Sequence, residues 1–311
     1  MIAAGLPVLA GDPPRAGSVR LEFTSTDPVY LRRDDVARVA GIRPGDPVGP
    51  DDLQYAIQNL YALNVFRSVE VYTDDAPAPE VVFRLDPFPM VDGLRWEGVR
   101  SIKRRELART ANVVRRMLLT DDMSDSIRAK IVDLYQEQGF LDASAGLKLQ
   151  PAPQGYDLTV AVDEGRRYRC RRSDAEMLDG QLLPEARALL GRLVNRFYTR
   201  QALDKAQKEI RKIYQQKDYP AIRVEYFIDA DPDAATVTPV FLLDVGPRLG
   251  VRVEGHRVGR DDLQKTLAIY RLADVSPFAE EISRDDLAGF LKNEKVPVAA
   301  VRSSRRAAPG G

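Results

Sequence analysis

The chain has 311 residues with 46 basic and 46 acidic side chains, so its formal net charge is zero. This balance argues against a general nucleic-acid binder, which would carry an excess of Lys and Arg. With one cysteine, Cys170, and one histidine, His256, the chain has no intrachain disulfide and no basis for a Cys/His metal site or a histidine-based triad. It also lacks a P-loop and a glycine-rich dinucleotide motif. We therefore expect no catalytic, cofactor-binding or metal-binding residue, no cofactor, and a function in binding rather than as an enzyme.

The first 17 residues precede any predicted helix or strand. Met1–Gly11 is short and apolar, but it lacks the basic start of a complete secretory signal. We expect residues 1–17 to be either a disordered N-terminus or the remnant of a signal peptide. No apolar run reaches the roughly 18 residues that a membrane-spanning helix needs.

Residues 18–88 form the first of a series of similar units. A turn at Asn64 ends its main helix just before the aromatic residue Phe66. Alternating strands at residues 67–73 and 81–85, separated by a Pro- and Asp-rich turn, predict a β-hairpin. The helix is predicted from apolar residues with the spacing of one helical face, namely Leu53, Ile57, Leu60 and Tyr61.

Residues 89–165 repeat this order. An opening strand at residues 93–98 ends in Glu97-Gly98, and its Trp96 is expected to lie in the core. The main helix ends at Gly139, where a glycine C-cap is expected, and Phe140 follows it. Strands are predicted at 143–149 and 158–162, which again form a hairpin.

Residues 166–246 are the third copy, and the matching residues occur at fixed offsets in all three. The aromatic anchors Phe66, Phe140 and Tyr219 lie 74 residues (66 to 140) and 79 residues (140 to 219) apart, and each has a tyrosine five positions before it. Such self-similarity is typical of a repeat architecture, here with the order β-α-α-β-β. The repeat anchors are Tyr61, Phe66, Tyr135, Gly139, Phe140, Tyr214 and Tyr219.

The third copy opens with a basic run, Arg166–Arg172. We interpret it as the opening strand, in which Tyr168 and Cys170 face the helices and the arginines between and beside them face solvent. The same residues are compatible with binding of phosphate, lipid head groups or nucleic acid.

Residues 247–311 form an incomplete fourth copy with an opening strand at 249–255. Matching Phe278 to Phe197 keeps copies four and three in register only as far as Leu291, after which the expected apolar residues are missing. We expect this copy to be poorly ordered and to end in a disordered tail. Either a truncated or frameshifted reading of a longer gene or a natural end accounts for the pattern.

Three acidic pairs occur along the chain: Asp51-Asp52, Asp121-Asp122 and Asp285-Asp286. All three are predicted at or near helix starts, where carboxylates favour the helix dipole and cap free N–H groups. We interpret them as structural residues rather than as paired catalytic carboxylates.

A β-α-α-β-β unit that opens with strand-Glu-Gly and ends its second helix at Tyr-x-x-x-Gly-Phe resembles the POTRA domain, most clearly at Tyr135–Phe140. Asn64-Val65-Phe66 and Lys217-Asp218-Tyr219 depart from the Gly-aromatic pair of that pattern. Tandem copies are similar to the periplasmic arm of the outer-membrane protein assembly family (BamA/TamA type). The resemblance implies an α+β fold in which each copy is a three-stranded sheet with two helices on one face, in an elongated array. It also implies a periplasmic location, attached to the outer membrane through a C-terminal barrel that these residues do not include.

In such a domain the resemblance places the strand after the second helix at a sheet edge, here residues 67–73, 143–149 and 221–228. An open edge offers unpaired backbone groups to another extended chain. The partners implied are unfolded outer-membrane protein clients and accessory lipoproteins or other assembly subunits, with no nucleic acid. The candidate protein-binding residues are Val69, Val71, Leu147, Leu149, Val224 and Tyr226.

Two alternatives to an outer-membrane protein assembly arm remain open. One is the POTRA region of a two-partner secretion or division-type protein, although such proteins usually carry one or two copies. The other is an anionic lipid- or nucleic-acid-binding module built on Arg166–Arg172.

Overall fold

The computed structural model describes residues 13–24, 30–298 and 300–304, so the proposed signal remnant Met1–Gly11 lies outside the described residues. The chain packs into two compact units. One holds the described residues up to Leu134 together with Ala143–Glu164, and the other holds Tyr135–Asp142 and the described residues from Gly165 onward. No helix in these described ranges is both long enough and apolar enough to cross a membrane.

The first repeat has β3 at the centre of its sheet, parallel to β1 and antiparallel to β2. Val81, Phe83 and Leu85 of β3 are completely buried and share one core with residues of both helices. A single core on one side of the central strand means that α1 and α2 cover the same face. The elements are β1 (Ser18–Phe23), α1 (Arg33–Ala40), α2 (Pro50–Tyr61), β2 (Phe66–Thr73) and β3 (Glu80–Pro87).

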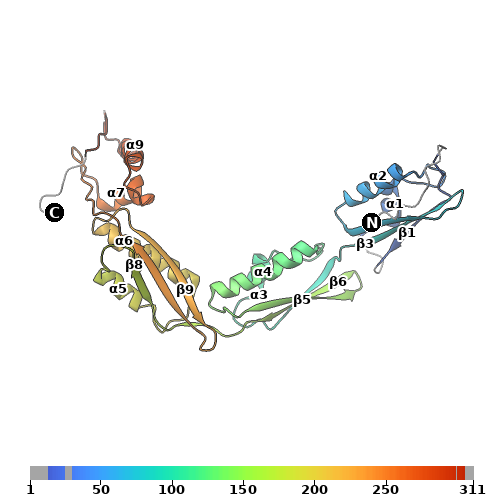
Figure 1. The fold of residues 1–311 in the computed structure, drawn as a ribbon, viewed down its shortest axis with the longest axis horizontal. Coiled ribbons are helices and arrows are strands. Elements are labelled where there is room, and N and C mark those ends of the chain that lie inside the picture. The colour runs from blue at the N-terminus through green and yellow to red at the C-terminus, as the bar shows by residue number, and fades with distance from the viewer. Residues whose placement is uncertain (1–12, 25–29, 299, 305–311) are drawn as a thin grey trace. The chain divides into compact units, whose positions relative to one another are not determined.

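The second repeat has the same strand order, β4-β6-β5, and Figure 1 shows α3 and α4 on one side of its sheet. Gly98 follows β4 at φ +74°, and a Cβ atom there would lie 1.9 Å from the carbonyl oxygen of Val162. The Glu-Gly motif therefore marks a position where only glycine fits. The elements are β4 (Val91–Glu97), α3 (Arg104–Thr110), α4 (Asp121–Glu137), β5 (Ser144–Ala152) and β6 (Gly155–Asp163).

The third repeat differs in its opening strand, which is split in two. The prediction of one strand over Arg166–Arg172 is wrong, because only Arg169–Cys170 (β7) is strand and β8 (Asp174–Met177) follows after a break. Pro239 of the central strand lies between the residues paired with β7 and those paired with β8. Proline has no N–H to donate, which accounts for the break. The other elements are α5 (Pro184–Gly191), α6 (Arg200–Gln216), β9 (Arg223–Asp231) and β10 (Thr236–Asp244).

The described part of the fourth copy is helical, with α7 (Arg260–Thr266), α8 (Ala268–Arg271) and α9 (Pro277–Asn293). The predicted strand at 249–255 is wrong, since these residues are irregular. In the complete repeats the opening strand pairs with the last strand of the same repeat, and the described residues of this copy supply no such strand. Val251 and Val253 pack instead against the helices.

The main helix of the fourth copy is complete, which corrects the register expected from Phe278. Helices α6 and α9 both have 17 residues, and both begin after a side-chain N-cap, at Thr199 and Ser276, 77 positions apart. The same shift brings Tyr219 onto Val296. Phe278 is not equivalent to Phe197. It is exposed in the first turn of α9, where packing in the core does not restrict which residue occurs.

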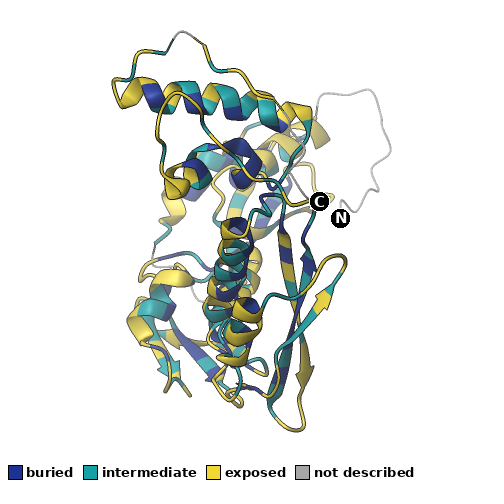
Figure 2. Cartoon of the chain, turned by 90° about the vertical axis from the view of Figure 1, so that its left-hand side faces the viewer, coloured by how far each residue is buried: buried dark blue, intermediate teal, exposed yellow. Residues whose placement is uncertain are grey.

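The buried residues of α9 recur every four positions, and the helix at the top of Figure 2 shows this alternation of buried and exposed residues. The buried residues are Ala279, Ser283, Leu287 and Leu291. This spacing corrects the position expected for Asp285-Asp286, which lies in the middle of α9. The carboxylate of Asp286 accepts a hydrogen bond from Arg271 at 2.6 Å instead of capping a helix. The other two acidic pairs lie in the first turns of α2 and α4, as predicted.

Candidate functional site

The strand after the second helix lies at a sheet edge in all three complete repeats. Among the described residues, β2 pairs only with β3, β5 only with β6, and β9 only with β10. One long side of each strand is therefore left without a neighbouring strand. The three edges differ in what covers them.

The edge of the second repeat, β5, is the most open. Leu147 lies opposite Val160 and is half-buried, while Leu149 lies opposite Leu158 and is 38% exposed. In the part of the chain that the structure describes, no side chain hydrogen-bonds to a backbone group of β5. An extended chain laid along β5 would thus meet free backbone groups and a partly exposed apolar row.

The edge of the first repeat, β2, is partly closed by a side chain. The N–H of Val69 donates to the hydroxyl oxygen of Tyr61 at 3.1 Å. Val69 is buried and Val71 is half-buried against the helices. Further along the strand, the Arg84 guanidinium lies 4.9 Å from the ring centroid of Tyr72. The start of this edge already has a partner within its own repeat.

The edge of the third repeat, β9, is capped from α6. The amide nitrogen of Gln207 donates to the carbonyl oxygen of Val224 at 2.7 Å. The hydroxyl of Tyr226 donates to Asp204 at 2.5 Å, and burial together with this bond raises the pKa of Tyr226. This edge is therefore held by α6 along its first residues.

The six candidate binding residues point to the helix-covered side of their sheets, where the two most buried, Val69 and Val224, have little surface to offer a partner. Leu149 offers the most. Sequence reasoning missed Tyr61 and Gln207 as edge caps, because their roles depend on how a helix side chain reaches the adjacent strand.

In copies two and three, the aromatic anchor packs against the tyrosine near the end of the main helix. The rings of Tyr135 and Phe140 meet edge to face with centroids 5.7 Å apart, and those of Tyr214 and Tyr219 are 6.0 Å apart. In both pairs the N–H of the later residue donates to the carbonyl of the tyrosine, at 3.0 and 3.1 Å. Tyr61 differs from the other two tyrosines, since it is 42% exposed.

The residue before each anchor also makes the joint to the next repeat. The carbonyl oxygens of Val65, Gly139 and Asp218 accept hydrogen bonds of 2.9, 2.8 and 2.6 Å. The three donors are the N–H groups of Phe88, the last residue of the first repeat, and of Tyr168 and Leu249, near the starts of the third and fourth copies.

Gly139 shows why this position is restricted. It has φ +95°, and a Cβ atom there would lie 2.2 Å from the carbonyl oxygen of Tyr198. Asp218 takes the same left-handed conformation at φ +71° in copy three. The glycine of the Tyr-x-x-x-Gly-Phe motif therefore serves both the helix end and the joint.

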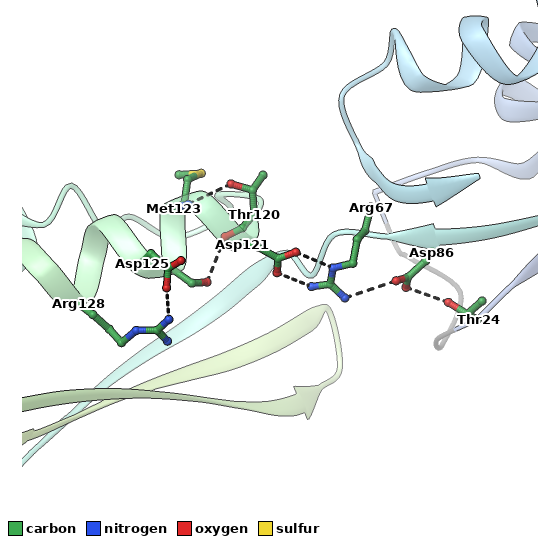
Figure 3. Close-up of polar contacts among 9 residues, drawn as sticks. Thr24, Arg67, Asp86, Thr120, Asp121, Met123, Asp125 and Arg128 are labelled. Atoms are coloured by element: carbon green, nitrogen blue, oxygen red, sulfur yellow. Dashed lines mark hydrogen bonds and ion pairs between the residues drawn. The ribbon is translucent and has the colours of Figure 1, made fainter. Parts of the chain in front are cut away.

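The first joint carries a polar network centred on Arg67, shown in Figure 3. Its guanidinium donates to both carboxylate oxygens of Asp121, at 3.1 and 3.0 Å, and to Asp86 at 3.4 Å. Asp86 also accepts from Thr24 at 2.8 Å. The guanidinium lies 5.7 Å from the ring centroid of Phe88 in the linker. Arg67 thus links the sheet of the first repeat with the start of α4 in the second.

The basic run follows the strand interpretation in its side-chain directions. Tyr168 and Cys170 are buried, whereas Arg167, Arg169 and Arg171 are exposed. Burial, reinforced by a 2.6 Å hydrogen bond to Asp142, raises the pKa of Tyr168 to about 12. Burial raises the pKa of the Cys170 thiol to about 11, so at neutral pH it is a protonated core residue.

No group of three or more His, Cys, Asp or Glu side chains suited to a metal ion occurs among the described residues. His256 lies exposed in a loop.

Comparison with protein-family models and with curated proteins finds no match. Among solved structures, the chain is similar to the N-terminal domain of Omp85 from Thermosynechococcus elongatus, with 14% identity, 75% of this chain and 98% of that chain covered, and a TM-score of 0.42. It is also similar to POTRA1-3 of Omp85 from Anabaena, with 16% identity, 75% and 96% covered, and a TM-score of 0.39. BamA POTRA3-5 from Haemophilus influenzae has 18% identity, 72% and 92% covered, and a TM-score of 0.38. The second and third of these structures are POTRA domains, the kind of repeat that the sequence resembles.

Proposed function

We propose that this chain is a binding arm whose open strand edges pair with extended segments of other proteins. The observation that carries the proposal is the edge of β5, where the described residues give the backbone groups on the side away from β6 neither a partner strand nor a side-chain cap. Adding a strand to such an edge gives affinity through main-chain hydrogen bonds and little dependence on sequence. That property suits a receptor for many different unfolded chains.

We place this arm in the periplasm, as part of an outer-membrane protein assembly factor. The partners would be unfolded outer-membrane proteins and accessory subunits of the assembly. The tandem β-α-α-β-β repeats, the Tyr-x-x-x-Gly-Phe motif and the open edge of β5 support this setting.

A proline scan at two adjacent positions of β5 tests the proposal. Along an antiparallel strand, the N–H groups of successive residues point alternately toward and away from the partner strand. Of Leu147→Pro and Lys148→Pro, one therefore removes a donor to β6 and the other removes a donor on the open side. The variant that lacks only the open-side donor keeps its hydrogen bonds to β6. Urea unfolding should therefore identify it as the more stable of the two.

The folded proline variant should bind a labelled peptide of alternating aromatic and polar residues at least tenfold more weakly than the unmodified chain, because proline blocks the ladder at its centre. The matched control is alanine at the same position as the proline, Leu147→Ala or Lys148→Ala, which removes the same side chain and keeps every backbone donor. Equal peptide binding by the unmodified chain and the folded proline variant would refute the edge-pairing function.

A further inference from the structure

The basic run at the start of the third repeat contains more arginines than the nearby carboxylates Asp142 and Asp174 pair with. We infer that Arg167 and Arg169, together with Phe197, form a contact site for the phosphate groups of an anionic phospholipid surface. The site lies within one compact unit of the chain and shares no residue with the β5 edge.

The ends of the run are satisfied internally. Arg166 donates to the carbonyl oxygens of Pro232 and Asp233 and lies 3.9 Å from the carboxylate of Asp142. Arg172 is paired with Asp174. In contrast, Arg167 and Arg169 form no ion pair with any residue that the structure describes. Arg171 is exposed and also forms no ion pair among the described residues, so the uncompensated positive charge lies on Arg167, Arg169 and Arg171.

The two central arginines are held in place by neutral groups. Arg167 donates to the carbonyl of Gln138 at 3.2 Å and Arg169 to that of Asn195 at 3.3 Å. Both guanidinium groups lie over the ring of Phe197, 4.5 and 4.0 Å from its centroid. Each guanidinium has five N–H donors, so most remain available to an incoming anion. Holding two like charges over one ring favours an anion that bridges them.

The backbone beneath these side chains is fixed from both sides. The buried side chains of Tyr168 and Cys170 anchor the strand in the core. The backbone N–H of Cys170 donates to the carbonyl of Arg196 at 2.8 Å, and the N–H of Tyr198 donates to the carbonyl of Tyr168 at 2.9 Å. The site is therefore preorganised, and little side-chain freedom remains to be lost when an anion binds.

The surroundings of the Phe197 ring favour a phospholipid surface over single-stranded nucleic acid as the partner. Single-stranded nucleic acid binds by stacking bases on aromatic faces, but here two guanidinium groups already cover the ring. The side chain is nevertheless 40% exposed. An exposed apolar edge beside arginines suits the boundary between lipid head groups and acyl chains. The zero net charge of the chain also disfavours a nucleic-acid partner.

Vesicle co-sedimentation with the whole chain tests the site. Vesicles of phosphatidylglycerol mixed with phosphatidylcholine should bind the chain, whereas pure phosphatidylcholine should not. Arg167→Gln/Arg169→Gln should weaken binding on the order of tenfold or more, since each arginine near an anionic surface contributes to the attraction. Arg187→Gln/Arg192→Gln removes the same charge from exposed positions around α5 and should leave binding within about twofold.

Several results would overturn the inference. One is equal weakening by the two double variants, which would indicate attraction by total charge alone. Another is inorganic phosphate or polyglutamate binding as tightly as the vesicles, which would indicate a free-anion or acidic-peptide site. A third is tighter binding of an oligothymidylate that the central double variant abolishes. If that variant fails to fold, salt titration of the unmodified chain decides, because vesicle binding that persists unchanged at high salt contradicts a phosphate contact.

Discussion

The edges of the first and second repeats share one strand order but differ in accessibility. In the first repeat the hydroxyl of Tyr61 accepts the N–H of Val69, whereas β5 of the second repeat has no such cap among the described residues. The difference begins at the helix end. The left-handed residue is Asn64, two positions before Phe66, in the first repeat, but Gly139, one position before its anchor, in the second.

This shift changes the role of an equivalent tyrosine. Helix α2 ends at Tyr61, five residues before its anchor, so Tyr61 is 42% exposed and turns toward the strand. Helix α4 continues past Tyr135, which is completely buried. The position of the left-handed residue therefore determines whether this tyrosine packs in the core, as Tyr135 does, or caps the edge, as Tyr61 does.

The largest loss of stability is expected from Gly139→Ala. This substitution distorts the end of α4, which keeps Tyr135 of the second repeat buried. A Cβ atom at φ +95° and 2.2 Å from the carbonyl oxygen of Tyr198 cannot be accommodated without movement. We expect a loss of at least ~2 kcal/mol in the free energy of unfolding, measured with urea. Gly191→Ala, at the end of α5 with nothing within 4 Å, is the control and should be neutral or slightly stabilising. Equal losses in both variants would contradict this account.

The second effect is a loss of stability at alkaline pH that arises from Tyr168, whose N–H bonds to the carbonyl of Gly139. A tyrosine in the unfolded chain has a pKa of about 10, whereas that of Tyr168 is raised to about 12. Its contribution to stability is therefore complete below pH ~10 and is lost as the pH rises from ~10 through ~12, because the unfolded state releases the proton first. Chemical denaturation across this range should show a steeper decline for the unmodified chain than for Tyr168→Phe. Parallel declines would show that Tyr168 does not carry the effect.

The third prediction concerns the cap that distinguishes the β2 edge from the β5 edge. Tyr61→Phe removes the hydroxyl that caps Val69 and should cost about 1 kcal/mol of stability, the usual value of one hydrogen bond. In the proposed function, it should also create a second site for the extended peptide, detected as an increase in binding stoichiometry. Tyr55→Phe, on the exposed side of α2, should change neither quantity. Unchanged stoichiometry for Tyr61→Phe would indicate that the cap does not control access.

The smallest effect is expected from Arg67→Gln at the first joint. The Arg67–Asp121 pair is bidentate, but its side chains are largely exposed to solvent. Such pairs contribute about 0–1 kcal/mol, and salt screens them. The stability difference between Arg67→Gln and the unmodified chain should therefore shrink as NaCl is raised. A difference that grows with salt would rule out an electrostatic role.

The sequence predicted the repeated unit, because apolar spacing and the Tyr-x-x-x-Gly-Phe pattern are local properties of the chain. Leu60 is completely buried where that spacing placed it. The sequence did not predict the break in the opening strand of the third repeat. The break lies opposite Pro239 of β10, which is far from that strand along the chain. The register of α9 was missed because its caps, not its aromatic residue, align with those of α6.

The candidate site was predictable in outline only. The edge position of β5 follows from the order of elements, but whether an edge is open depends on which side chain of the adjacent helix reaches it. The repeat pattern marks Tyr61 only as an anchor and does not mark Gln207 at all, and only the folded geometry brings them to Val69 and Val224. The joint contacts of Arg67 likewise depend on the helix of the following repeat.

At the second and third joints, the hydrogen bond from the start of a repeat to the carbonyl before the preceding anchor has a consequence for folding. The acceptor belongs to a helix end, and the donor belongs to the next repeat, as with Gly139 and Tyr168. Fraying of that helix end therefore frees the neighbour, and docking of the neighbour secures the helix end. Unfolding should then spread between adjacent repeats as coupled nearest-neighbour steps, so that each joint sets the cooperativity of the two repeats it connects.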